Sequence, residues 1–182
     1  MSPEEAFQLI NTAPLPSYII PPVWADLGCG SGLFTDALAR MLPDKSIIFG
    51  VDKSTGFLSH ATPGGVSIVF RQADFQKEEI DLHNLDGILM ANALHYVNDK
   101  PGFLFGLKHR LNAGASFLIV EYDSDRPVPS WVPYPVSFAS LQQLFRDAGY
   151  SRIRKLATHP SIYHSGEMYA AFIEPNEPAA GY

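Results

Sequence analysis

A glycine-rich segment near the start of the chain restricts the fold more than any other feature of the sequence. Gly28, Gly30 and Gly32 follow a short apolar run, residues 23–27, and come directly before a stretch in which apolar residues recur at helical spacing. These glycines let the backbone approach a ligand closely, and the helix that follows points its first N–H groups at that ligand. The segment therefore predicts a strand, a turn and a helix that together bind a small molecule.

The middle of the chain repeats this alternation of strand and helix. Short apolar runs suited to buried parallel strands predict five strands, at residues 23–27, 46–51, 66–71, 85–91 and 115–122. Helical spacing of apolar residues predicts helices over 33–41 and 103–111, the second behind a start signal at Asp99 and Pro101, and both should pack on the sheet. Such alternation is typical of an α/β fold built on a mainly parallel sheet.

The C-terminal part of the chain breaks the alternation. Residues 123–135 contain several prolines and predict a long loop, after which Ser137 caps a helix that Gly149 ends. Two β-like runs follow, 151–158 and 167–174, with only a short turn between them. Since that turn leaves no room for a crossover helix, we expect the last two strands to pair antiparallel.

The two ends of the chain differ from the middle. Residues 1–22 predict a short helix, 3–10, followed by a proline-rich lead-in. Residues 175–182 carry too little apolar surface to pack, so we expect a disordered tail there. A length of 182 residues with 46% hydrophobic content then predicts one domain, over residues 1–174.

Composition and charge argue against several classes of function. The formal net charge is −6 and no run of Lys and Arg forms a basic stripe, so we expect no nucleic-acid partner. The start lacks the features of a signal peptide, and no apolar run approaches the ~20 residues that span a bilayer. We therefore expect a cytoplasmic protein without a membrane partner. Cys29 is the only cysteine and the six histidines are scattered, which predicts no metal site.

The spacing of the glycines separates two kinds of nucleotide-binding loop. The dinucleotide fingerprint G-x-G-x-x-G needs glycine at its sixth position, which is Leu33 here, and the third glycine comes one residue earlier. The segment Asp26-Leu27-Gly28-Cys29-Gly30-Ser31-Gly32 instead resembles the D/E-x-G-x-G-x-G motif of class I S-adenosylmethionine-dependent methyltransferases. The resemblance implies that S-adenosylmethionine binds at this loop, with Asp26 as the leading acid.

Further markers of that family stand at the ends of the next strands. Asp52, at the end of the second strand, resembles the carboxylate that accepts hydrogen bonds from both ribose hydroxyls. Asp74 and Phe75, after the third strand, resemble the pair that takes the adenine amino group and meets the base. The full set of cofactor-binding residues that the resemblance implies is Asp26, Gly28, Gly30, Gly32, Asp52, Lys53, Asp74, Phe75, Ala91 and Asn92.

Each acid taken singly is equally consistent with a turn cap or a solvated loop residue. Their joint placement at successive strand ends favours a ligand site, because open α/β sheets bind ligands outside the carboxyl ends of their strands. The resemblance spans residues 22–174. It implies a three-layer Rossmann-like sandwich with a seven-stranded, mostly parallel sheet, in the order 3-2-1-4-5-7-6 with strand 7 antiparallel.

Methyl transfer from a sulfonium is an in-line displacement that depends chiefly on positioning, and it needs a base only when the acceptor must lose a proton. His95 and Tyr96 follow the fourth strand, near the expected methyl group, and are the candidate catalytic residues. Packing in the protein interior is the alternative role for both. Asn92-Ala93-Leu94-His95 stands where methyltransferases of DNA bases or glutamine carry N/D-P-P-Y, which by elimination favours a small-molecule acceptor.

Aromatic and acidic residues that follow the fifth strand or lie in later loops are candidates for an acceptor pocket: Glu121, Tyr122, Trp131, Tyr134, Tyr163 and His164. Surface loops anchored by buried rings would give the same pattern. The segments that would form a lid are short. The predicted pocket is therefore either open or completed by a second subunit in a homodimer.

Two other functions remain open from the sequence. A Rossmann oxidoreductase would use Asp52 for the ribose of NAD, although Leu33 and the antiparallel ending argue against it. A protein that binds S-adenosylmethionine without catalysis would keep the same glycine loop, because binding does not imply turnover.

Overall fold

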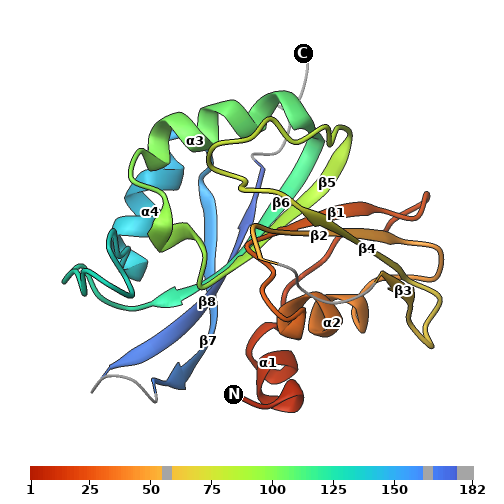
Figure 1. The fold of residues 1–182 in the computed structure, drawn as a ribbon, viewed down its shortest axis with the longest axis horizontal. Coiled ribbons are helices and arrows are strands. Elements are labelled where there is room, and N and C mark those ends of the chain that lie inside the picture. The colour runs from red at the N-terminus through yellow and green to blue at the C-terminus, as the bar shows by residue number, and fades with distance from the viewer. Residues whose placement is uncertain (55–58, 162–165, 176–182) are drawn as a thin grey trace.

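The computed structural model describes residues 1–54, 59–161 and 166–175 (Figure 1). The helices are α1 (Pro3–Ile10), α2 (Leu33–Ala39), α3 (Lys100–Leu107) and α4 (Phe138–Asp147), with short 3-10 helices η1 (Leu94–Tyr96) and η2 (Lys108–Arg110). The strands are β1 (Val23–Leu27), β2 (Ile47–Asp52), β3 (His60–Ala61), β4 (Ser67–Gln72), β5 (Leu85–Ala91), β6 (Leu111–Tyr122), β7 (Arg152–Pro160) and β8 (Glu167–Glu174).

All the strands belong to one sheet, in the order β3-β4-β2-β1-β5-β6-β8-β7. The neighbouring pairs from β4 to β6 are parallel, whereas β8 runs antiparallel to both β6 and β7. The predicted order and the antiparallel ending are confirmed. One correction is the number of strands, which is eight among the described residues because β3 pairs antiparallel with the outer edge of β4. With two residues, β3 is too short for alternation of apolar and polar side chains to predict it.

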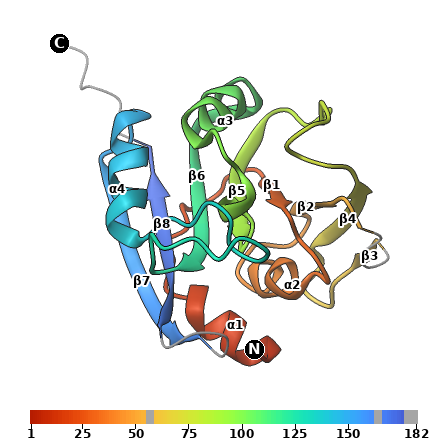
Figure 2. The same ribbon diagram turned by 60° about the vertical axis from the view of Figure 1, so that its left-hand side comes forward.

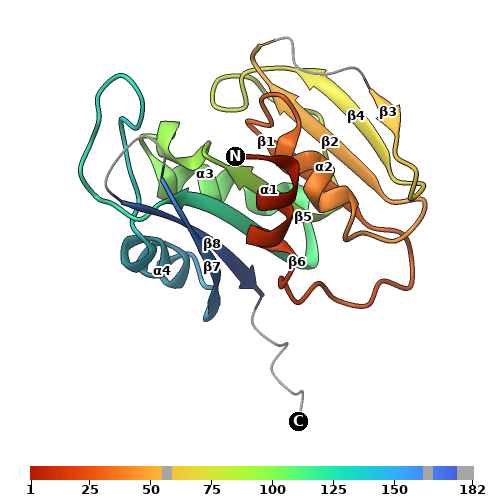
Figure 3. The ribbon, with the colours of Figure 1, turned by 90° about the horizontal axis from the view of Figure 1, so that it is seen from below.

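Helices cover both faces of the sheet and make three layers (Figures 1 and 2). Helices α1 and α2 lie against one face, where Figure 3 shows them in front of the strands. Helices α3 and α4 pack on the opposite face. Two apolar clusters hold these layers together, one around Trp24 and Phe172 under α1 and α2, the other around Ile88 and Phe145 under α3 and α4.

Capping residues close in the sequence account for where most of the helices begin. Helix α1 begins with Pro3 behind a capping box in which the Glu5 N–H donates to the Ser2 hydroxyl and the Glu5 carboxylate accepts from the Ser2 N–H. The helix predicted over 103–111 begins behind Asp99, the expected start signal, but it ends at Leu107, because the chain tightens into η2 before β6 begins at Leu111. Strand β6 is therefore longer than predicted, with an irregular register opposite the start of β5.

Within the described ranges, no helix is both long and apolar enough to cross a membrane. Residues 176–182 of the predicted tail lie outside the described residues, so the prediction of disorder there stays a prediction.

Candidate functional site

A cleft of about 460 Å³ opens where the carboxyl ends of β1, β2, β4 and β5 meet at one edge of the sheet. The strand order reverses between β1 and β5, and open α/β sheets bind ligands at such a switch point. Seven of the predicted site residues line the cleft: Gly28, Asp52, Lys53, Asp74, Phe75, Asn92 and Tyr96. Three residues that the sequence analysis did not select complete the lining: Gln76, Ala93 and Ser130.

The glycine loop reaches this cleft at Gly28. The Gly28 and Cys29 N–H groups donate to the Val51 carbonyl at 2.8 and 3.1 Å, which holds the loop against β2. Gly28 has a φ of 81°, and a Cβ atom on it would lie 2.5 Å from the Cβ of Ala93. A side chain at this position would therefore both strain the backbone and close the approach between the loop and the segment after β5.

Gly30 and Gly32 continue the loop but do not line the cleft directly. Gly30 has a φ of 54°, and a Cβ atom there would meet nothing within 4 Å, so the space above it is open. Gly32 is the N-cap of α2 and also has a left-handed backbone, with a φ of 86°. The loop thus presents backbone rather than side chains to whatever occupies the space above it.

Asp52 connects the end of β2 to the glycine loop. Its Oδ2 accepts a hydrogen bond from the Gly30 N–H at 2.9 Å, and its Oδ1 accepts from the Ser54 N–H at the same distance. These two bonds fix the orientation of the carboxylate, and each oxygen keeps a lone pair for a further donor. Asp52 is therefore placed to accept hydrogen bonds from a ligand without turning.

Asp74 and Phe75 form the wall of the cleft after β4. Asp74 starts a turn in which its Oδ1 accepts from the Gln76 N–H at 3.1 Å, and its side chain is mostly covered. The Phe75 ring stacks at a tilt against Phe103 of α3, with centroids 5.8 Å apart. This contact holds an apolar ring at the side of the cleft, beside Gly28.

Two buried oxygen atoms near the cleft have no hydrogen-bond partner among the described residues. Asn92, which lines the cleft, has a left-handed backbone with a φ of 54°, and its Oδ1 is one of them. The other is Oδ1 of Asp26. Buried polar atoms are almost always paired in folded proteins, so an unpaired acceptor beside a cleft indicates a ligand or water that donates to it.

Asp26 lies beneath the glycine loop instead of lining the cleft. Its carboxyl is 1% exposed, and its Oδ2 accepts from the Thr35 hydroxyl of α2 at 2.6 Å. Burial raises the pKa of Asp26 to about 7, the Thr35 hydrogen bond opposes the rise, and the Asp52 carboxylate adds to it. Ala91, the remaining predicted residue, ends β5 and is half-buried outside the lining.

His95, the first candidate catalytic residue, is buried. It is 2% exposed and does not line the cleft, and its Nδ1 lies 2.7 Å from Oε2 of Glu121, a buried residue of β6. The Glu121 carboxylate also accepts the His95 N–H through Oε1 at 3.0 Å. The Nε2 atom of His95 is buried and has no partner among the described residues.

Two tyrosines flank this buried pair. The Tyr96 ring, which lines the cleft, has its centroid 4.3 Å from that of His95, and the Tyr122 ring lies 6.1 Å away. Glu121 was a candidate only for an acceptor pocket in the sequence analysis. The one signal for its role was an acid at the end of an otherwise apolar strand, which must find a partner when that strand is buried.

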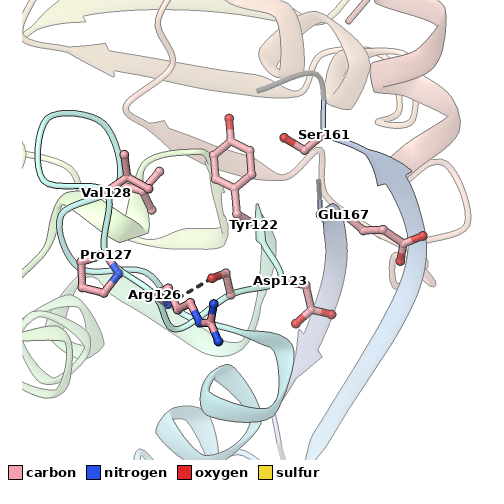
Figure 4. Close-up of a pocket in the computed structure, with 10 residues that line it drawn as sticks. Tyr122, Asp123, Arg126, Pro127, Val128, Ser161 and Glu167 are labelled. Atoms are coloured by element: carbon pink, nitrogen blue, oxygen red, sulfur yellow. Dashed lines mark hydrogen bonds between the residues drawn. The ribbon is translucent and has the colours of Figure 1, made fainter. Parts of the chain in front are cut away.

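A second cavity, of about 400 Å³, opens at the carboxyl end of β6 (Figure 4). Figure 4 shows Tyr122 between the loop that carries Arg126, Pro127 and Val128 and the hairpin that carries Ser161 and Glu167. The remaining lining residues are Asp123, Ser124, Val132 and Gly166. Of the predicted pocket residues, Tyr122 therefore lines this cavity, and Tyr163 and His164 lie outside the described residues.

The loop between β6 and α4 separates the cleft from the cavity, since Ser130 lines the first and Val128 and Val132 line the second. Val128 and Val132 form an isolated antiparallel bridge that folds the loop tip back on itself. The loop returns to the body of the protein at Tyr134, whose N–H donates to the His95 carbonyl at 3.0 Å and whose carbonyl accepts from Lys100 Nζ at 2.6 Å.

The described residues contain no group of three or more His, Cys, Asp or Glu side chains arranged to hold a metal ion.

Comparison with known proteins yields similarities of sequence and of fold. Residues 25–114 match the family described as "Methyltransferase domain". A ubiquinone biosynthesis O-methyltransferase from Azorhizobium caulinodans is 34% identical over 83 residues, which are 43% of this chain and 32% of that protein. The chain spans about a third of the length of the curated relatives it matches.

Solved structures extend the similarity to nearly the whole fold. A Burkholderia thailandensis 1,6-didemethyltoxoflavin-N1-methyltransferase superposes with a TM-score of 0.65 at 15% identity, over 97% of this chain and 79% of that one. An arsenic(III) S-adenosylmethionine methyltransferase from Chlamydomonas reinhardtii gives a TM-score of 0.64 at 15% identity, over 100% of this chain and 75% of that one.

Proposed function

We propose that this chain, whose residues 25–114 match a methyltransferase domain, is a class I S-adenosylmethionine-dependent methyltransferase that transfers a methyl group from this cofactor to a small-molecule acceptor. One observation carries the proposal. The cleft at the sheet's switch point combines an oriented carboxylate, Asp52, with the glycine loop and a buried acceptor atom of Asn92 that has no partner among the described residues.

The residues present fit the cofactor. The cofactor brings hydrogen-bond donors at its ribose, its adenine amino group and its ammonium group, and the cleft offers acceptors in Asp52, Asp74 and Asn92. The open space above Gly30 leaves room for backbone contact, which a Cβ atom would reduce. Asp74 is paired with Lys77 at 3.4 Å, so the Asp52 carboxylate is the group of the lining that suits a ligand with a sulfonium charge.

We assign roles to the residues on this basis. Asp52 would accept from the ribose hydroxyls, Asp74 from the adenine amino group, and Phe75 would pack against the base. Asn92 and the glycine loop would hold the amino-acid end. The bound cofactor would supply an activated methyl group, and the chain would bring the acceptor into line with it and exclude water.

His95 is our candidate for the base, and Glu121 for the residue that positions it. When Nδ1 donates its hydrogen to Glu121 Oε2, Nε2 is left as a proton acceptor. The second bond, from the His95 N–H to Oε1, prevents the carboxylate from rotating away. The ring of Tyr96, which is 45% exposed, would have to shift for an acceptor to reach Nε2 from the cleft.

The names of similar proteins support a small-molecule acceptor without identifying it. One curated relative is a ubiquinone biosynthesis O-methyltransferase, and one structural neighbour methylates 1,6-didemethyltoxoflavin at N1. A net charge of −6 is consistent with this class, because it disfavours binding to a nucleic acid.

Calorimetry with S-adenosylhomocysteine, S-adenosylmethionine and NADH tests the proposal. We expect heat of binding from the first two and none from NADH, because Leu33 replaces the glycine that the dinucleotide loop requires. Binding of NADH alone would favour an oxidoreductase and contradict the proposal.

Catalysis needs a separate test. We expect His95→Ala to bind S-adenosylhomocysteine as tightly as the wild type but to transfer methyl groups about 100-fold more slowly to an acceptor that must lose a proton. Unchanged turnover would remove His95 from the mechanism. Cofactor binding by a wild type that transfers no methyl group to a broad panel of acceptors would favour a non-catalytic binding protein.

A further inference from the structure

We propose that Tyr96 and Ser130 bind the methyl acceptor within the cofactor cleft, and that the acceptor is a planar, uncharged aromatic compound with a hydrogen-bonding group. The inference rests on the proposed function, which it deepens by naming the acceptor site and the class of acceptor. It concerns binding alone, so it does not depend on a proton transfer to His95.

The charged residues that line the cleft lie on one side of it. They end or follow β2 and β4, and they are Asp52, Lys53 and Asp74. The lining that follows β5, or that comes from the loop between β6 and α4, carries no charge. We call it the uncharged half of the cleft, and it consists of Asn92, Ala93, Tyr96 and Ser130.

Under the roles proposed above, the uncharged half borders the methyl group of the cofactor. With the ribose at Asp52 and the amino-acid end at Asn92, the sulfur that carries the methyl group would lie between these two residues. Ala93 and Tyr96 continue the chain from Asn92 and line the same cleft. A molecule against Tyr96 would therefore share one continuous space with the methyl group, and in-line transfer requires such contact.

The Tyr96 ring offers a supported flat surface to an acceptor. Tyr96 is 45% exposed, and the ring of the buried His95 packs against it with centroids 4.3 Å apart. His95 thus supports the Tyr96 ring from the interior of the protein. An aromatic molecule that stacks on this ring gains more than the area it buries, because paired rings attract each other electrostatically.

Ser130 is held at the cleft by the anchoring of its loop. Lys100 Nζ donates to the Val97 and Tyr134 carbonyls at 2.9 and 2.6 Å, which joins the end of the loop to the segment after Tyr96. The Ser130 hydroxyl has no hydrogen-bond partner among the described residues. It is therefore available to a polar group of the acceptor.

The same contacts disfavour a charged acceptor. An anion would find no cation in the uncharged half, and the nearby Lys100 is already bonded to two carbonyls. A cation would be repelled by the sulfonium of the cofactor. Two more aromatic residues of the loop, Trp131 and Tyr134, are 47% and 42% exposed, and exposed apolar groups beside a cleft are typical of a binding site.

Calorimetry on the protein saturated with S-adenosylhomocysteine tests the class of acceptor. We expect 2-naphthol to bind about fivefold more tightly than decahydro-2-naphthol, which keeps the O–H group but lacks flat rings. It should bind about tenfold more tightly than 2-naphthoate, which carries a charge. Tighter binding of either of the other two compounds would overturn the proposed class.

Substitution of Tyr96 tests the site through the ratio of the affinities for 2-naphthol and decahydro-2-naphthol. Tyr96→Leu should lower this ratio from about five to about one, and Tyr96→Phe should keep it, because stacking needs only the ring. The matched control is Phe105→Leu, which removes a 66% exposed ring outside the cleft lining. An unchanged ratio in Tyr96→Leu would overturn the assignment, and a general loss of stability would not alter the ratio.

Ser130→Ala tests the polar contact in the same way. In the wild type we expect 2-naphthol to bind about fivefold more tightly than naphthalene, and in Ser130→Ala about equally. A variant that keeps the wild-type preference would remove Ser130 from the site.

Methyl-labelled alanine and valine locate the bound probe. In the complex with S-adenosylhomocysteine, 2-naphthol should shift the resonance of Ala93, which lines the cleft, and leave that of Ala6 in α1 unchanged. A shift at Val132 without one at Ala93 would place the probe in the second cavity and overturn the inference.

The outcomes separate this inference from the proposed function. If wild type fails to bind S-adenosylhomocysteine, the proposed function fails, whatever 2-naphthol does. If S-adenosylhomocysteine binds and Ala93 does not respond to 2-naphthol, only the acceptor site is wrong. If Trp131→Ala converts a dimer into a monomer and Tyr96→Leu leaves the ratio unchanged, the exposed rings bind a second copy of the chain, which also overturns the inference.

Discussion

The cleft and the second cavity lie at the same edge of the sheet but are built in different ways. The cleft takes its lining from residues that directly follow β1, β2, β4 and β5, with Ser130 as the exception. The cavity is lined by the long loop after β6 and by the two ends of the β7 and β8 hairpin. Hydrogen bonds of a parallel sheet thus position the first, and contacts between loops position the second.

Because the two regions are built differently, we expect them to respond differently to single substitutions. Gly28 and Asp52 of the cleft are held by hydrogen bonds that involve backbone groups, from the Gly28 N–H to the Val51 carbonyl and from the Gly30 N–H to Asp52. A single substitution elsewhere on the surface does not disturb these bonds. The loop beside the cavity depends on side chains such as Lys100 and Asp125, the latter accepting from the Ser137 N–H at 2.9 Å. The buried pair of His95 and Glu121 has a neighbour in each region, because the His95 ring lies 4.3 Å from the Tyr96 ring of the cleft and 6.1 Å from the Tyr122 ring of the cavity.

The largest effect should come from breaking that pair. We expect Glu121→Ala to destabilise the fold by about 3–5 kcal/mol, because it leaves the His95 N–H and ring buried without an acceptor. Urea denaturation measures the loss. Glu121→Gln keeps the shape and one acceptor oxygen, so it should retain most of the stability but lower kcat by favouring the wrong tautomer of His95. A fully active Glu121→Gln variant would show that the pair is only structural.

The second effect concerns the cleft alone. We expect Asp52→Ala to weaken binding of S-adenosylhomocysteine about 100-fold, since it removes the acceptor of the ribose and frees the Gly30 N–H at the same time. Calorimetry measures the affinity. Asp81→Ala, whose side chain is 91% exposed, is the matched control and should bind normally. Equal affinities for the two variants would contradict the role of Asp52.

The third effect is a dependence of stability on pH that arises beneath the cleft. Burial raises the pKa of Asp26 to about 7, so the folded state holds a proton that the unfolded chain releases near pH 4. Asp26 therefore favours folding at low pH, and this contribution is lost as the pH rises towards 7, by on the order of 2 kcal/mol between pH 5 and pH 8.

Asp26→Asn separates this contribution from those of other groups. Asparagine keeps an oxygen for the Thr35 hydroxyl but does not titrate, so the free energy of unfolding should change less between pH 5 and pH 8 than in the wild type. Urea denaturation at the two pH values measures both proteins. Identical pH profiles would show that Asp26 titrates at its ordinary pKa.

The smallest effect is a difference in stability between alanine variants of two glycines in one loop. Alanine at Gly28 or Gly30 costs about 1 kcal/mol through the left-handed backbone. Gly28→Ala costs on the order of 1 kcal/mol more, because its Cβ would lie 2.5 Å from that of Ala93, whereas a Cβ on Gly30 meets nothing within 4 Å. Thermal unfolding should therefore rank Gly28→Ala below Gly30→Ala, and the reverse order would contradict the described loop.

The features that could be predicted from the sequence are those with a local signal. The order of the sheet and the positions of Asp52 and Asp74 after their strands follow from apolar runs and turns, because a parallel sheet brings the ends of such strands to one edge. It was least successful for Ser130 and for the two-residue strand β3. Neither lies in a periodic pattern. Ser130 reaches the cleft from a loop that is distant in the sequence from the other lining residues, and β3 pairs with an edge of β4 that only the folded sheet creates.

Within the site, His95 shows the same limit of prediction from local sequence. The sequence placed it after β5, near the cofactor, but its partner Glu121 lies 26 residues away on β6. Register between β5 and β6 decides that contact, and residue type alone does not specify register. The burial of both residues follows from the aromatic rings and the loop that cover them.

The alternation of strands and helices, the glycine loop and the acids at the strand ends can all be predicted from the sequence, because each depends on residues close together in the chain. Three features arise only in the folded protein: the pairing of His95 with Glu121, the burial of Asp26, and the second cavity beside the loop. Those contacts join segments distant in the sequence. The distances between these segments are set by packing within the whole fold and not by a local pattern.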